Sequence, residues 1–256
     1  MLCRAVFVCA VVSYAFAQTR VDAVREQYNG TYANAAEQNT FNHEPNAFLV
    51  EMLRTWKPGR ALDVGMGQGR NAIWLAKQGW NVTGFDLSDA GVKLAQEKAS
   101  DAGVKINAVV ANADEFDFGS DQWDLIVLSY VPFTSYRDRL IQSLKPGGVV
   151  LVEFLHEDTR RVRLFNGGFK DNELIHAFPG LRVLRYEDVW AKQDWGVQLD
   201  GNNRLVWLLA QKPALPSPTC EWERKTYSHG GEACWGAMKL RCSSEGWQRA
   251  GNCSGK

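Results

Sequence analysis

The sequence predicts an α/β domain built on a parallel sheet, followed by a small cross-linked module. Three observations predict this organisation. Apolar strand-like runs alternate with helical segments from about residue 46 to residue 153. A glycine-rich turn follows the first of these runs, and four of the six cysteines lie after residue 219.

Length and charge limit the classes of function. The chain has 256 residues, enough for one large domain with a smaller one attached. Its 29 Lys and Arg residues balance its 29 Asp and Glu residues, and no basic run occurs. A nucleic-acid partner therefore has no electrostatic footprint in the sequence, and a small-molecule substrate is favoured.

The first 17 residues have the pattern of a secretory signal. An apolar run from Ala5 to about Val12 precedes Ala15-Phe16-Ala17, the small-x-small pattern that signal peptidases cut. The run is too short for a stable membrane span. We therefore expect cleavage near Ala17 and export to the periplasm or the extracellular space, the alternative being a cytoplasmic protein with an apolar first helix.

Two segments lead into the domain. Residues 20–38 are polar with scattered alanines and tyrosines, and we expect them to be helical or partly ordered. Apolar positions on one face predict a helix over about residues 46–55, which Pro58 and Gly59 separate from the first strand.

A βαβ unit comes next and organises the rest of the chain. It runs through a strand, a turn, a helix and a second strand, at residues 61–64, 65–69, 71–77 and 80–85. Gly65, Gly67 and Gly69 remove every second β-carbon from the turn, so a ligand can approach the backbone N–H groups at the start of the helix. Asp86 ends the second strand, where a carboxylate can accept both hydroxyls of a ribose. A nucleoside-bearing ligand is therefore predicted.

The spacing of the glycines selects the ligand. Arg70 stands where the third glycine of a dinucleotide fingerprint would fall, which argues against an NAD-dependent oxidoreductase. Asp63 and the three glycines, as D-x-G-x-G-x-G with Asp86 further on, resemble the cofactor signature of class I S-adenosylmethionine (SAM) methyltransferases. The resemblance implies that the glycine turn meets the methionine end of SAM and that Asp86 holds its ribose.

The α/β alternation continues to residue 211. Helices are expected at 90–99, 137–144 and from Asn172 to near Pro179, and strands at 107–110, 123–128, 149–153, 181–186 and 202–211, with a turn at 145–148. The resemblance implies a Rossmann-like seven-stranded sheet with helices on both faces, over residues 18–212. Within the family, residues 41–51, 69–88 and 144–150 are most similar to tellurite-resistance-type and related small-molecule enzymes.

Further site residues follow from the resemblance. The family commonly has an acidic residue where Asn112 stands, accepting from the adenine amino group, and the backbone N–H of Ala113 would meet a ring nitrogen. The Asn112 amide oxygen can still accept, and Asp114 is the alternative. We also include Ser129, at the tip of the fourth strand, in the cofactor site, and we expect no metal.

Methyl transfer from a sulfonium needs no nucleophile of the enzyme, but some acceptors must lose a proton. The candidate bases near the strand tips are His43, Tyr130, Glu153 and His156. The segment Ser129-Tyr130-Val131-Pro132-Phe133 lacks the N-P-P-Y or D-P-P-Y motif of many enzymes that methylate nucleic-acid or protein nitrogens, which argues against an amide or base-amine acceptor.

Composition changes after residue 212. Residues 213–219 form a proline-rich linker, and residues 220–256 are rich in Cys, Trp and Gly. We expect a β-rich module of two or three strands with two disulfides among Cys220, Cys234, Cys242 and Cys253. Zinc, with His229 as a further ligand, is the alternative. The module could bind a wall or matrix component at a surface, or merely cap the enzyme.

Two functions follow from these expectations. The first is a SAM-dependent methyltransferase acting on a small thiol, chalcogen oxyanion or hydroxyl compound. The second is an exported, non-catalytic protein that binds a nucleoside or metabolite and docks to a surface through its Cys-rich tail. The second function is considered because SAM is made in the cytoplasm, whereas the signal pattern predicts export. The intact glycine turn and Asp86 favour the first function.

Overall fold

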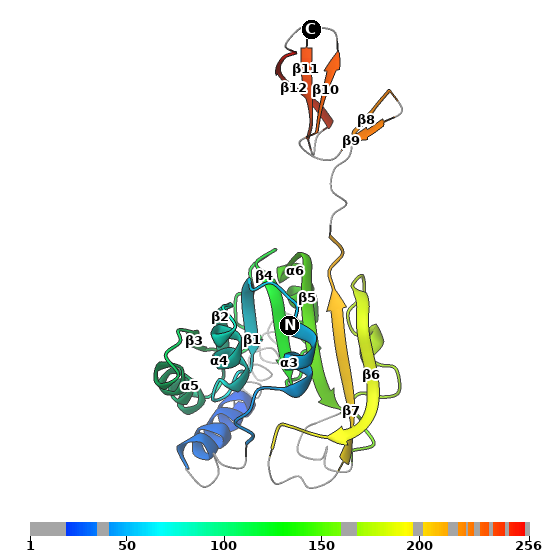
Figure 1. Cartoon of the computed structure of the whole chain (residues 1–256). Helices are drawn as coiled ribbons and strands as arrows, with labels where there is room; N and C mark the ends of the chain where they lie inside the picture. Colours follow the sequence, from blue (N-terminus) through cyan, green and yellow to red (C-terminus); the bar gives the residue numbers. More distant parts are fainter. Residues whose placement is uncertain are drawn as a thin grey trace, which may run out of the picture. The chain divides into compact units, whose positions relative to one another are not determined.

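The computed structural model of the chain describes residues 19–34, 41–159, 168–196, 202–214, 220–223, 225–227, 231–235, 238–243 and 246–253. It divides into two compact units, Met1–Lys212 and Pro213–Lys256 (Figure 1). The predicted signal at residues 1–17 lies outside the described residues, as does His229.

A seven-stranded sheet forms the first unit, in the order β3-β2-β1-β4-β5-β7-β6. Its strands are β1 (Arg60–Val64), β2 (Asn81–Asp86), β3 (Asn107–Val110), β4 (Trp123–Ser129), β5 (Leu144–Leu155), β6 (Arg182–Lys192) and β7 (Asn202–Gln211). The first five are parallel, and β7 pairs antiparallel with both β5 and β6. The predicted fold class is confirmed.

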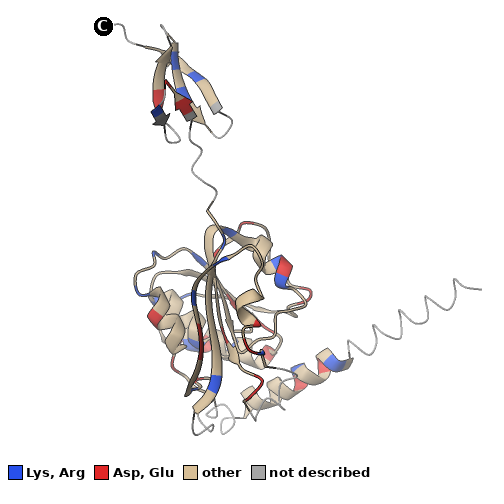
Figure 2. Cartoon of the chain, turned by 90° about the vertical axis from the view of Figure 1, so that its right-hand side faces the viewer, with Lys and Arg blue, Asp and Glu red and all other residues tan. Residues whose placement is uncertain are grey.

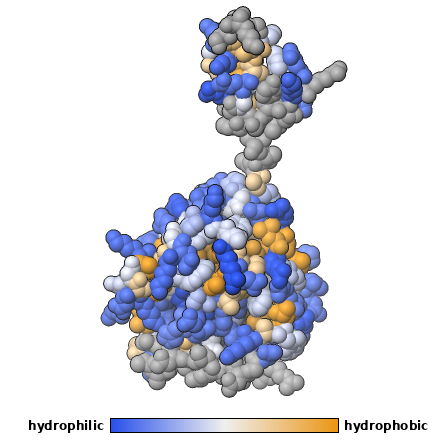
Figure 3. Space-filling view, viewed as in Figure 1, coloured by the Kyte–Doolittle hydropathy of each residue, from blue (hydrophilic) through white to orange (hydrophobic). Residues whose placement is uncertain are grey.

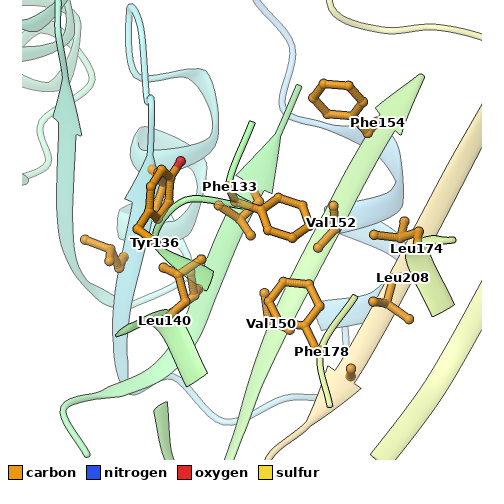
Figure 4. Packing of buried hydrophobic residues seen from close by; sticks show 14 of the residues in the cluster. Phe133, Tyr136, Leu140, Val150, Val152, Phe154, Leu174, Phe178 and Leu208 are labelled. Carbon is orange, nitrogen blue, oxygen red and sulfur yellow. The ribbon is translucent and has the colours of Figure 1, made fainter. Parts of the chain in front are cut away.

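Alternation along the central strands sends apolar side chains to two faces, as period 2 requires. Leu125 and Val127 of β4 pack with α3 (Ala47–Leu53) and α4 (Arg70–Lys77). Ile126 and Leu128 face the opposite way, into the cluster that contains Leu140 of α6 (Arg137–Ser143) (Figure 4). Helix α5 (Asp89–Asp101) buries Val92 and Ala95 beside the sheet.

Helices at the start and end of the unit differ in how well the sequence predicted them. The lead-in forms a helix over residues 19–33. The helix expected from Asn172 is instead one 3₁₀ turn, η2 (Leu174–His176), and Asn172 before it has a left-handed φ of 59°. The predicted turn at 145–148 lies inside β5, where the pairing with β4 is irregular.

The C-terminal unit contains two small antiparallel sheets. One pairs β8 (Cys220–Trp222) with β9 (Lys225–Tyr227), and the other has the order β10 (Glu232–Trp235), β11 (Met238–Ser243), β12 (Gly246–Asn252). The ring of Trp222 lies 6.1 Å from that of Trp235 and 6.2 Å from that of Trp247. Five strands thus form where two or three were expected.

One predicted disulfide is identified in this unit. Cys234 and Cys253 are bonded, and Cys242 is also in a disulfide. These sulfur atoms are therefore not free thiolates, which removes the basis for the zinc alternative.

Segments coloured for basic residues and for acidic residues are both spread along the ribbon in Figure 2, in keeping with the zero formal charge. The face shown in Figure 3 is mostly hydrophilic, with scattered apolar areas. Among the residues that the structure describes, no helix combines the length and apolar character of a membrane span.

Candidate cofactor and active site

The glycine turn has the conformation that its sequence predicts. Gly65, Gly67 and Gly69 all have positive φ angles, of 64°, 53° and 82°. A β-carbon on Gly65 would lie 2.5 Å from Val131, and one on Gly67 would lie 2.4 Å from the Tyr32 hydroxyl. Both the backbone angles and the close neighbours therefore require glycine at these positions.

Asp86 is held against this turn. One carboxylate oxygen accepts from the Gly67 backbone N–H at 2.8 Å, and the other accepts from the Ser88 N–H at 2.8 Å. Burial raises the pKa of Asp86, whereas these backbone donors lower it. The two halves of the predicted cofactor signature thus meet directly.

Two adjoining cavities cross the carboxyl ends of the strands. The larger, of about 350 Å³, is lined by Asp86, Asn112, Ala113, Asp114, Ser129 and Tyr130, among others. The smaller, of about 50 Å³, is lined by Gly65, Gly67, Gln68, Arg70 and Asn71, among others. Both are also bounded by Tyr32, Gly65, Ser129 and Trp195, so they form two compartments of one site.

Three buried polar atoms in this region have no hydrogen-bond partner among the described residues. They are Ser129 Oγ, on a side chain that lines both compartments, Gln68 Nε2, on a side chain that lines the smaller one, and Asp63 Oδ2. Asp63 is 1% exposed, and burial, as the largest cause, raises its pKa to about 7. Orphaned polar groups of this kind fit a ligand with polar and cationic groups at the methionine end, as SAM has.

The adenine side of the site departs slightly from expectation. The Asn112 amide oxygen accepts from the Asp114 N–H at 3.2 Å, so one of its lone pairs is used locally. Asp114 accepts from the Ser135 hydroxyl at 2.9 Å. Both side chains line the larger compartment, and each retains accepting capacity for an amino group.

A buried polar network borders the larger compartment. The Tyr130 hydroxyl donates to Glu153 Oε1, and Asn46 Nδ2 donates to Glu153 Oε2 at 2.7 Å. Asn46 also caps α3 through Oδ1, which accepts from the Leu49 N–H at 2.8 Å. The network therefore links the tips of β4 and β5 to the start of α3.

Arg70 links this network to a distant part of the chain. Its guanidinium pairs with the Asp194 carboxylate at 3.0 Å and also donates to the backbone oxygen of Glu44 at 3.0 Å. Asp194 in turn accepts from the Ala47 N–H at 2.9 Å. Arg70 thus fixes the segments before α3 and after β6 over the strand tips, and places Trp195 at the site.

The four candidate bases separate into two groups. Tyr130 and Glu153 lie together beside the cofactor compartments. His43 is exposed, with Nδ1 at 3.4 Å from Lys98 Nζ, and lines a separate cavity of about 440 Å³.

His156 directly follows β5 and is buried in a separate cluster. Its Nδ1 accepts from the Asp158 N–H at 3.1 Å, and its Nε2 lies 3.2 Å from an Asp171 oxygen. Arg204 pairs with Asp158, Asp171 and Asp188 at 2.5–2.7 Å. The guanidinium already occupies the carboxylates that would otherwise offer a metal-ligating set.

Sequence reasoning missed several residues of the site. Tyr28 and Tyr32 of the helix at 19–33 line the larger compartment, and their ring centroids lie 6.3 Å apart. Trp195 closes the same compartment, with its ring 5.5 Å from that of Phe41. The sequence signal that could have identified the two tyrosines is their spacing of four residues, which places both side chains on one face of the helix.

The fold and this site together define a class I SAM-dependent methyltransferase domain. The strand order, the glycine turn tied to Asp86 and the two-compartment site at the strand tips are the features that define it. Residues 61–148 match the family described as "Methyltransferase domain".

Similarity to individual proteins agrees with this assignment. The chain is 30% identical over 180 residues to ribosomal RNA small subunit methyltransferase C of Alcanivorax borkumensis, covering 61% of this chain and 54% of that protein. It is 32% identical over 148 residues to the ubiquinone/menaquinone biosynthesis C-methyltransferase UbiE of Geotalea daltonii, covering 54% and 59%. The chain thus spans little more than half the length of these curated relatives.

A solved structure shows the same fold. The crystal structure of TehB from Haemophilus influenzae aligns with a TM-score of 0.57 at 21% identity, covering 64% of this chain and 61% of that chain. TehB of this organism, named a probable SAM-dependent methyltransferase, is also 24% identical in sequence over 149 residues, covering 55% of this chain and 52% of that protein. The predicted resemblance to class I SAM-dependent methyltransferases is confirmed.

Proposed function

We propose that the first unit transfers a methyl group from SAM to a small-molecule acceptor. SAM supplies a methyl group on a cationic sulfur, which is already activated for displacement. The chain's own residues would hold the ribose at Asp86, the adenine at Asn112 and Ala113, and the methionine end along Gly65, Gly67 and Asp63. The remaining task of the protein is to orient the acceptor and exclude water.

One observation carries this proposal: Ser129 and Trp195 bound both compartments, so the space beside the glycine turn continues to Tyr130 and the buried network. A cofactor bound on the glycine turn would therefore point its methionine end toward polar groups that can contact an acceptor. A non-catalytic nucleoside-binding protein has no need of this second, polar wall.

The names of the relatives do not choose between a nucleic-acid acceptor and a small one, because one relative acts on ribosomal RNA and another in quinone biosynthesis. Two observations on the present chain favour a small acceptor. The present chain has zero formal charge, which gives no electrostatic support for a partner with a phosphate backbone. The larger compartment, of about 350 Å³, has the size of small-molecule sites.

Calorimetric titration with SAM and with its demethylated product tests this function. We expect the disulfide-bonded protein to bind both at micromolar concentrations. Asp86→Ala should abolish binding while a cooperative thermal transition remains, because the ribose loses its acceptor; Asp101→Ala, at the exposed end of α5, is the matched control. Binding of SAM by Asp86→Ala with wild-type affinity would contradict the ribose assignment, and no binding by the wild type would contradict the function.

We further propose that the protein is exported and that its C-terminal unit docks to a surface component. The signal pattern at residues 1–17 and the Cys234–Cys253 disulfide support export, because disulfides persist in oxidising compartments. The exposed indole of Trp235, 64% accessible, supports a docking role for the small unit.

A further inference from the structure

Tyr130 and Glu153 form a buried pair at the tips of two adjacent strands. Ser129 of β4 pairs with Glu153 of β5, and the Tyr130 N–H donates to the Glu153 backbone oxygen at 2.9 Å. The two side chains are 5% and 2% exposed and share a hydrogen bond. Tyr130 adopts a φ of 60°, which a tyrosine rarely does outside functional sites.

Among the residues that the structure describes, only neutral groups donate hydrogen bonds to the Glu153 carboxylate. Its two oxygens accept from the Tyr130 hydroxyl and from the Asn46 amide. The nearby cation, Arg70, is bonded to Asp194 instead. Burial, followed by the charge of Asp194, raises the pKa of Glu153 to about 7, although Arg70 and the two donors oppose this. The carboxylate can therefore take up a proton near neutral pH.

The pair reaches the site through one member only. Tyr130 lines the larger compartment together with Asp86 and Ser129, whereas Glu153 lies behind it. The ring of Trp195 stands 6.1 Å from that of Tyr130. An acceptor placed beside Ser129 and Trp195 would thus meet the tyrosine and not the carboxylate.

We propose that Tyr130 and Glu153 act together as the proton acceptor for a neutral hydroxyl or thiol substrate. The acceptor's O–H or S–H bond breaks and its electron pair stays on the acceptor atom. The proton passes to the Tyr130 oxygen, while the Tyr130 proton passes to Glu153. The freed electron pair would then bond to the methyl carbon as the carbon–sulfur bond of SAM breaks and its electron pair stays on sulfur. This inference rests on the proposed methyl-transfer function and assigns Tyr130 the catalytic contact, with Glu153 as the group that drives it.

Charge around the pair narrows the class of acceptor. Glu153, Asp194 and Asp63 are three carboxyl groups with Arg70 as the only cation that the structure places among them. Above about pH 7, where Glu153 and Asp63 are ionised, an oxyanion would be repelled there, whereas a neutral protic molecule would not. The site therefore favours hydroxyl or thiol acceptors over the chalcogen oxyanions that the sequence left open.

Tyrosine labelled with ¹³C at Cζ offers a test that needs no acceptor. In the full protein, the Tyr130 signal, assigned with Tyr130→Phe, should shift between about pH 6 and pH 8 as Glu153 ionises. Glu153→Gln, which keeps hydrogen-bonding capacity but cannot ionise, should abolish the shift; Glu187→Gln on β6 is the matched control. A flat Tyr130 signal in the wild type, or an unchanged shift in Glu153→Gln, would overturn the proposal.

Kinetics separate proton acceptance from a structural role. We would compare methyl transfer to a phenol, neutral at pH 7, and to a nitrothiophenol, already ionised. Tyr130→Phe and Glu153→Gln should slow the reaction of the phenol by about 10²-fold or more, whereas neither variant should slow that of the thiolate. Equal losses with both acceptors would indicate structural residues. SAM binding is measured in parallel. Absence of SAM binding would contradict the proposed function, whereas SAM binding with equal losses for both acceptors would contradict only the role of the pair.

Discussion

In the ligand-free protein, the buried carboxyl group of Asp63 lowers the stability of the fold when it is ionised. Its carboxylate lies in the core of β1, near Arg70, with Oδ2 lacking a partner among the described residues. A buried charge without full pairing is unfavourable, so the folded protein holds a proton on Asp63 at a pH where the unfolded chain does not. Stability therefore does not explain the residue, in keeping with the proposed role of Asp63 in binding SAM.

Asp63→Asn should stabilise the ligand-free protein at high pH. The pKa rises from 3.8 in the unfolded chain to about 7 in the folded protein, so wild-type stability falls as pH increases between these values and is constant above them. Asp63→Asn does not lose stability in this way, because its side chain does not ionise. Urea unfolding should show a gain over the wild type that grows by roughly 2–4 kcal/mol from pH 4 to pH 8, together with weaker SAM binding. An effect on stability that is equal at both pH values would contradict this account.

Residues of the site differ in how far the sequence could predict them. The glycine turn and Asp86 were predictable because they lie within one βαβ unit, where local conformation and strand order fix their meeting. The Arg70–Asp194 pair was not, since its members stand 124 residues apart and nothing local marks them as partners. Trp195 could not be predicted for the same reason, because the Arg70–Asp194 pair places it at the site.

At the scale of elements, the helix over residues 19–33 closes the cofactor site. Its Arg25 side chain donates to the Leu87 backbone oxygen at 3.2 Å, and Asn29 accepts from the Ser88 hydroxyl at 2.6 Å. Tyr32 lies over Gly67 and Gly91, whose missing side chains make room for its ring. The strands were predicted well because period-2 and continuous apolar runs mark them, whereas the docking of this polar helix depends on contacts with the turn after β2.

Tyr32→Ala should loosen this helix and weaken SAM binding. The tyrosine is 8% exposed, so its removal leaves a cavity against the glycine turn and costs about 3 kcal/mol or more of packing. We expect faster amide hydrogen exchange over residues 19–33 and a SAM affinity lower by about tenfold, an energy of ~1.4 kcal/mol. Gln27→Ala, an exposed position on the same helix, is the matched control. Unchanged exchange in Tyr32→Ala would show that other contacts hold the helix.

On the scale of the whole molecule, the chain joins a self-sufficient domain to a unit that depends on cross-links. The first unit buries two large apolar clusters on either side of its sheet. In the second unit, the described side chains classed as buried are only Ala233, Leu240 and Cys242. So small a core cannot offset chain entropy, which is why cysteines, visible in the sequence, predicted this unit better than hydrophobic periodicity did.

Cys234→Ser should therefore unfold the C-terminal unit and leave cofactor binding intact. The Cys234–Cys253 bond spans 19 residues, and closing a loop of that length stabilises a fold by roughly 3 kcal/mol, an amount comparable with what three buried side chains supply. All residues that line the cofactor compartments belong to the first unit, so calorimetry should give the wild-type SAM affinity. Loss of the near-ultraviolet signal of the tryptophans would report unfolding, and Cys253→Ser should behave identically. Weakened SAM binding in both variants would instead mean that the small unit contributes to the site.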